Sequence, residues 1–240
     1  MKRILHRCNS MQHVDLALKT AYDGIEIDLR RNHNNFPGIA VTHDVSPSSG
    51  GWELESFLED LIGFLEATSS LEPVYASTRP FQVFLDVKDT DLLQTLKEMW
   101  TKRSNSFGSA AERSKAEFFL FDVPGVETIR YLEWISTLTF NPPKLLLRMS
   151  EFETPAVPVQ YVSNVGIILD SFYEHSQTTL LGLACRGLRG LPPDAPFVML
   201  ANGLHGRPYL MNLKHPRLTH MIGKDIDFTN VLPYSEPFDE

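Results

Sequence analysis

The stretch GIEIDL, residues 24–29, carries two carboxylates inside an otherwise apolar run. Its length and its isoleucines are typical of a buried β-strand. Residues two apart on a strand face the same side, so we expect Glu26 and Asp28 to lie together on one face. Buried carboxylates are costly unless they are paired or bind a metal. The stretch therefore predicts a strand that carries chemistry.

Two further apolar runs carry charge in a similar place. ILHR ends in His6 and Arg7, and QVFLDVKD carries Asp86 and Lys88 two residues apart. A single histidine at a strand end is more often structural, and an Asp and a Lys on one strand face can form an internal ion pair. The convergence is more informative, because all these groups fall at or near the carboxyl ends of the first three predicted strands. In a barrel these ends meet at one rim, where catalytic groups lie.

Eight short runs rich in Ile, Val, Leu and Phe recur along the 240 residues. Segments with helical spacing lie between them, and the clearest is residues 52–67, WELESFLEDLIGFLEA. Strands that alternate with helices imply right-handed βαβ units and a parallel sheet. The pattern thus predicts an α/β fold, a (β/α)₈ TIM barrel in a single domain spanning residues 1–240. The runs begin near Arg3, Gly24, Gln82, Glu117, Lys144, Val165, Phe197 and Thr219.

An open doubly wound sheet is the structural alternative, but no GxGxxG motif follows the first strand. Further helices are expected after Ser10, Thr90 and Pro124, with Ser10 as an N-cap. Gly24 is suited to ending the first helix. We expect a polar connection over residues 102–115 and a loose acidic tail from about residue 233.

Composition narrows the class of protein. With 22 Lys and Arg against 30 Asp and Glu, the net charge of -8 argues against binding to nucleic acid or to an anionic membrane face. Cys8 and Cys185 form no CxxC pair, so neither a disulfide framework nor a zinc ribbon is expected. The chain shows no signal-peptide core and no transmembrane run, which favours a cytoplasmic location. The oligomeric state stays unknown at this level.

The acidic residues predict a site for a hard divalent cation. Glu26, Asp28 and Asp86 offer only oxygen ligands, which favours Mg²⁺ or Ca²⁺ over zinc and leaves positions for substrate oxygens. Arg7 and Lys88 supply positive charge suited to a phosphate. Two histidines, His6 and the His43 of GIAVTHD, are available as general acid and base.

The order of these motifs resembles the glycerophosphodiester phosphodiesterase family and its relatives, the phospholipase D toxins of spider venom. The matching motifs are His6-Arg7, Glu26-x-Asp28, His43-Asp44 and Asp86-x-Lys88. The resemblance implies a (β/α)₈ barrel that cleaves a small-molecule glycerophosphodiester-like or lysophospholipid-like phosphodiester in lipid metabolism. It implies metal-dependent catalysis by two histidines, in which the substrate's own neighbouring hydroxyl can be the nucleophile. Asn9 is then expected to reach the phosphate.

The chain departs from the family pattern at four places. Cys8 stands where the family commonly has Gly, and Asp86 stands where many members use Glu, as in the toxin branch. The stretch after His43 leads almost directly to the helix expected at Trp52, so the small inserted subdomain is missing. No Trp follows Trp134, so the usual aromatic of the last strand is absent. These departures argue against assuming a glycerol head group.

Three later stretches, FFLFDVPGVETIRYLE, IILDSF and GLHGR, resemble small bacterial barrels of this family, some of them linked to surface polysaccharides. For Asp122, Asp170 and His205 we favour a strand-end or capping role over catalysis. Two other functions stay open. One is a non-catalytic barrel that binds a phosphorylated ligand or partner. The other is a metal-dependent isomerase or aldolase in which Lys88 forms a Schiff base.

Overall fold

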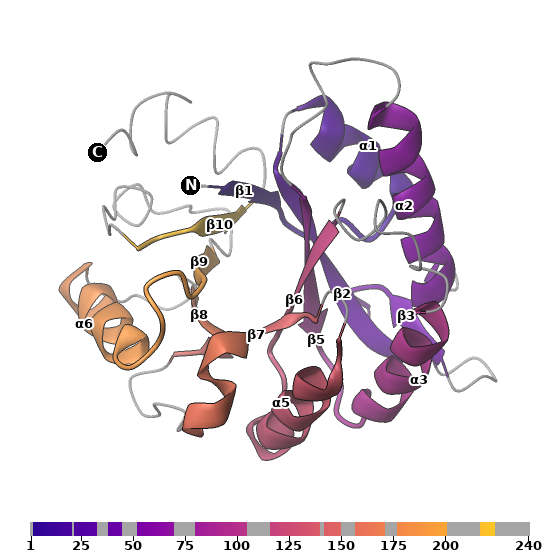
Figure 1. Cartoon of the computed structure of the whole chain (residues 1–240). Helices are drawn as coiled ribbons and strands as arrows, with labels where there is room; N and C mark the ends of the chain where they lie inside the picture. The colour runs from indigo at the N-terminus through magenta and orange to yellow at the C-terminus, as the bar shows by residue number, and fades with distance from the viewer. Residues whose placement is uncertain are drawn as a thin grey trace.

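Eight parallel strands form a closed barrel (Figure 1). The structure is a computed structural model and describes residues 2–20, 22–32, 38–44, 52–69, 80–104, 116–139, 142–149, 157–170, 177–200 and 217–223. The barrel strands are β1 (Lys2–Leu5), β2 (Gly24–Asn32), β5 (Phe81–Val87), β6 (Ala116–Phe121), β7 (Lys144–Arg148), β8 (Val165–Asp170), β9 (Phe197–Leu200) and β10 (His220–Gly223). Neighbours in this order pair in parallel, and β1 also pairs with β10, which closes the ring.

The predicted TIM barrel is confirmed, and the open sheet is wrong because β1 is hydrogen-bonded on both sides. Each strand begins at the predicted residue or one residue away. Helices lie on the outer side of the ring (Figure 1). Their bounds are α1 (Met11–Lys19), α2 (Leu54–Ser69), α3 (Leu93–Ser104), α5 (Thr128–Thr137) and α6 (Gln177–Leu188), with 3₁₀ helices η1 (Gly125–Glu127) and η2 (Val159–Asn164).

The first helix begins as predicted and ends earlier than expected. The Ser10 hydroxyl accepts a hydrogen bond from the His13 N–H, which satisfies one of the exposed donors of the first turn. The helix ends at Lys19, so the prediction that Gly24 ends it is wrong. Gly24 instead opens β2, where an added Cβ would fall well inside van der Waals contact of the Gln82 carbonyl oxygen. A residue without a side chain is therefore needed at position 24, where β2 and β5 approach closely.

An antiparallel hairpin that the sequence did not predict extends the barrel wall beside β2. It consists of β3 (Gly38–Val41) and β4 (Trp52–Glu53), and β3 pairs with the last four residues of β2. Because β4 takes up Trp52, helix α2 begins two residues later than expected, at Leu54. His43 lies two residues after the end of β3, so this hairpin sets its place in the fold.

The barrel is filled by alternating side chains. Residues facing the interior form one apolar cluster, and residues facing outward pack beneath the helices in two others. The interior cluster comprises Ile4, Phe84, Phe119, Phe121, Leu146, Ile168, Val198, Leu200 and Ile222. This packed layer closes the barrel below the acidic residues, so it is a core rather than a channel.

Several predicted features lie outside the described residues: most of the connection after Lys102, His205 and the acidic tail from about residue 233. Within the described part of the chain, no helix is long and apolar enough to cross a membrane.

Candidate active site

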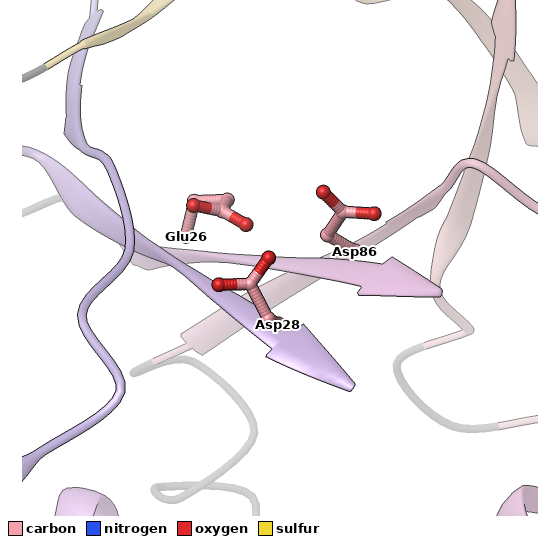
Figure 2. A group of neighbouring side chains, drawn as sticks. All are labelled: Glu26, Asp28 and Asp86. Carbon is pink, nitrogen blue, oxygen red and sulfur yellow. The ribbon is translucent and has the colours of Figure 1, made fainter. Parts of the chain in front are cut away.

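Three carboxylates of the neighbouring strands β2 and β5 lie close together, Glu26 and Asp28 in the first five residues of β2 and Asp86 near the carboxyl end of β5. Glu26 and Asp28 come from β2, and the register pairs Asp28 with Asp86 of β5. All three side chains are buried, and one oxygen of each lies within 4.8 Å of the others. Figure 2 shows the three carboxyl groups gathered above the two strands. The strand alternation read from the sequence accounts for this arrangement.

The triad has the chemistry of a cation site. Among the described residues, Oε1 of Glu26 and Oδ1 of Asp86 are buried and accept no hydrogen bond. Within the described part of the chain, Oδ1 of Asp28 has no hydrogen bond and forms an ion pair with Lys88. Buried acceptors without donors are costly, and carboxylate oxygens are the ligands that Mg²⁺ and Ca²⁺ prefer. These residues fit a hard divalent cation.

The pKa shifts of the triad also agree with a cation site. Burial, and then the charges of Asp28 and Asp86, raise the pKa of Glu26 well above its usual value. Burial, and then the nearby Asp122, raise the pKa of Asp86 to about 7. Without a cation the ionised carboxylates therefore repel one another in a poorly solvated place.

Lys88 supplies part of the missing positive charge. Its ammonium group bonds to Asp86 and lies 3.2 Å from Oδ1 of Asp28. Burial opposes the charged form, but Asp86 outweighs it and raises the pKa of Lys88. The internal ion pair considered from the sequence is therefore present, and it spans two of the three carboxylates.

Arg7 turns its backbone toward the triad. It adopts a left-handed conformation with φ of 58°, and its N–H donates to Oε2 of Glu26 at 2.6 Å. Its Nε is buried and donates to no acceptor among the described residues. An unsatisfied guanidinium nitrogen suits an anionic oxygen such as that of a phosphate.

The two residues after Arg7 fasten β1 to β2. Both ends of the Asn9 amide engage Asp28: Nδ2 donates to Oδ2 at 2.7 Å, and Oδ1 accepts from the Asp28 N–H at 2.9 Å. Its observed contacts thus orient a carboxylate, and phosphate binding by Asn9 stays a prediction. Cys8 is fully buried and its N–H donates to the Glu26 carbonyl. The positive φ falls on Arg7 and not on Cys8, so the backbone conformation at position 8 does not require a glycine.

The two histidines lie at the same rim but in different surroundings. His6 is buried, with Nε2 at 3.5 Å from Oε2 of Glu26. His43 is exposed and follows β3, where the neighbouring Thr42 N–H donates to the Asp28 carbonyl. Partial burial and then the Arg7 charge lower the pKa of His43. A neutral His43 can accept a proton near neutral pH.

The rim also holds charged residues that were missed or were given other roles. Arg148, at the end of β7, forms an ion pair with Asp122, which has a φ of 58°. Arg30 and Asp89 form another, with nitrogen and oxygen 2.9 Å apart. The alternation that selected Glu26 and Asp28 continues to Arg30, so Arg30 could have been found. Its partner, 59 residues away, could not.

Comparison with known proteins bears on the fold. No family model and no curated protein sequence matches this chain. The solved glycerophosphodiester phosphodiesterase of Agrobacterium tumefaciens aligns with a TM-score of 0.59 at 14% identity, over 96% of this chain and 100% of that one. That of Parabacteroides distasonis aligns with a TM-score of 0.55 at 13% identity, over 94% and 93%. This likeness shows the fold. It agrees with the family that the sequence motifs resemble.

Proposed function

We propose that this chain is a metal-dependent phosphodiesterase that acts on a small-molecule phosphodiester. The proposal is carried by the buried triad of carboxylates together with Arg7, whose N–H donates to Glu26 and whose buried guanidinium Nε has no acceptor among the described residues. A divalent cation would satisfy the first, and an anionic substrate oxygen would satisfy the second. A phosphodiester bound at a metal presents such an oxygen, and the solved enzymes of the same fold carry phosphodiesterase names.

Glu26, Asp28 and Asp86 would hold Mg²⁺ or Ca²⁺, and their oxygen-only set does not distinguish the two. The cation would offset negative charge on the phosphate as the transition state forms. Asn9 orients Asp28 through both amide atoms, and the Arg7 N–H orients Glu26. These bonds would hold two of the three proposed ligands in place for a cation.

The chain's own groups would handle the protons and the remaining charge. Arg7 would bind a phosphate oxygen, and Lys88 would do so once a cation takes over its carboxylate partners. His6 and His43 would divide the work, one removing a proton from the attacking hydroxyl and the other protonating the leaving oxygen. The attacking hydroxyl would come from water or from the substrate itself. The head group, cytoplasmic location and role in lipid metabolism stay predictions from the sequence.

The test is turnover of a panel of glycerophosphodiesters, lysophospholipids and sugar phosphodiesters with Mg²⁺, Ca²⁺ or excess chelator. We expect cleavage that requires the metal and falls by ~10²-fold or more in His6→Ala and in His43→Ala. Circular dichroism of both variants should match that of the wild type. Binding of a phosphodiester without turnover across the panel would favour the non-catalytic barrel, and full activity in chelator would overturn the mechanism.

A further inference from the structure

Arg30 connects two parts of the active-site rim that are distant in sequence. It lies four residues after Glu26 on β2, so it shares the face that carries the triad. Its Nε donates to the main-chain oxygen of His43 at 2.9 Å, and its Nη1 donates to Oδ1 of Asp89 at 2.9 Å. One planar guanidinium thus bonds to the stretch after β3 and to the loop after β5.

Asp89 is itself fixed in place. Its second oxygen, Oδ2, accepts the Arg31 N–H at 2.8 Å, so its carboxylate spans two consecutive residues of β2. Asp89 directly follows Lys88, whose own N–H donates to the Leu29 carbonyl. The anchor for Arg30 is therefore tied to the barrel wall by two backbone contacts.

His43 has greater need of such an anchor than His6. His6 is buried, and its N–H donates to the Gly223 carbonyl at 2.8 Å. His43 is exposed and lies beyond the last ladder residue of β3. Proton transfer needs heavy atoms at hydrogen-bond distance, and a misplacement of about 1 Å can cost ~10²-fold in rate.

We propose that Arg30 is a positioning residue that holds His43 in place for proton transfer, through the bond to its main-chain oxygen and the ion pair with Asp89. This inference rests on the proposed function of the site. Arg30 needs two differently directed N–H groups for this work. A lysine offers a single ammonium on a flexible stem and cannot reproduce both bonds in the fork geometry.

The neighbouring arginine provides a matched control. The Arg31 side chain is 47% exposed and reaches Thr90 and Asp91, and its backbone N–H bond to Asp89 survives a side-chain substitution. We expect Arg30→Met to lower kcat by about 10- to 100-fold with KM within about twofold. Arg31→Met should leave both constants near the wild type, and Arg30→Lys should not restore kcat.

A double-mutant cycle separates positioning from general damage. If Arg30 acts through His43, adding Arg30→Met to His43→Ala should cost no further activity, because the group it positions is already gone. If Arg30→Met lowers kcat by the same factor in the His43→Ala background as in the wild type, the inference is wrong. The same holds if Arg30→Met raises only KM.

Hydrogen exchange of the stretch 38–44 gives a readout that does not depend on turnover. Arg30→Met should speed exchange there, and Arg31→Met should not. An unchanged rate in Arg30→Met overturns the inference even if the enzyme is active. A wild type that cleaves no phosphodiester overturns the proposed function instead, and the exchange result then decides alone whether Arg30 holds the His43 stretch.

Discussion

The ammonium nitrogen of Lys88 lies 3.2 Å from Oδ1 of Asp28, on the neighbouring strand. The same ammonium bonds to Asp86 on its own strand. The Lys88 ammonium group therefore bridges two of the three buried carboxylates. Whatever enters the triad must compete with this contact or share it, which makes Lys88 a sensitive probe of the site.

Lys88→Met should destabilise the metal-free protein by about 2 kcal/mol, because it leaves buried carboxylates without their positive partner. The value is below that of a fully buried pair since the Lys88 side chain is 22% exposed. Saturating Ca²⁺ or Mg²⁺ should reduce the difference in stability between Lys88→Met and the wild type, because the metal ion supplies the missing positive charge. Urea denaturation in chelator and in excess metal measures both values.

Lys102→Met is the control for that experiment. Lys102 forms an ion pair with Glu55 at 3.0 Å, but its side chain is 72% exposed. Such surface pairs contribute between 0 and about 1 kcal/mol, and metal should not change the effect. A Lys88 variant that behaves like this control would show that the bridge contributes nothing to the site.

Glu26→Gln should abolish stabilisation by metal without harming the metal-free protein. The neutral amide mimics the protonated carboxyl that burial favours, and its oxygen can still accept the Arg7 N–H. In wild type, a metal concentration 100-fold above Kd should add about 2.7 kcal/mol to the free energy of unfolding. The variant should lose this gain while matching or exceeding the wild type in chelator.

The partly buried carboxylate of Glu55, in the first turn of α2, serves as the comparison. Glu55→Gln removes a charge far along the chain from the triad and should keep the full metal-dependent gain. Should Glu26→Gln retain the gain as well, the cation would bind elsewhere and the proposed triad would be wrong.

The barrel was predictable because each strand is short, apolar and bounded by helical spacing. The triad followed from two arguments: alternation puts Glu26 and Asp28 on one face of a strand, and the predicted barrel brings Asp86 of a neighbouring strand to the same place. The hairpin was missed because β3 and β4 have four and two residues, too few to show a period. The charged end of β2 also resembles a loop in sequence, although it pairs with β3.

Partners set by the closed fold could not be predicted. The resemblance implies that Asn9 reaches the phosphate, which stays a prediction, but the bonds of both its amide atoms to Asp28, 19 residues away, could not be predicted. Gly24 was assigned to a helix end because glycine often ends helices. Its reason lies instead in Gln82 of the neighbouring strand.

Gly24→Ala should therefore destabilise the protein by about 3 kcal/mol, because the new methyl group must displace backbone of β5 rather than a movable side chain. Gly63→Ala is the matched control within helix α2, where an added Cβ meets nothing within 4 Å. Alanine should stabilise that helix by up to about 1 kcal/mol. Urea denaturation of both variants tests the pair, and equal stabilities would contradict the packing at β2 and β5.

His220 should make the protein sensitive to acid. It is buried at the start of β10, its Nε2 lies 3.2 Å from Oε1 of Gln82, and it packs edge-on against Phe84 and Phe119. Burial, and then the charge of Lys2, lower its pKa to about 3. Folding therefore keeps this imidazole neutral.

The stability of the protein should fall as the pH is lowered, because the unfolded chain binds a proton at His220 more readily than the folded chain does. Below pH 6.5 the unfolded chain binds a proton at His220 that the folded chain does not bind until about pH 3, so stability is lost as pH falls through this window. The slope is at most about 1.4 kcal/mol per pH unit, which amounts to about 2 kcal/mol at pH 5. His220→Gln removes the titrating group and can still bond to Gln82. The variant should be less stable than the wild type at pH 7, and the difference should shrink by about 2 kcal/mol at pH 5. If the stabilities of the two proteins change in parallel between pH 7 and pH 5, folding does not lower the pKa of His220 and the prediction is wrong.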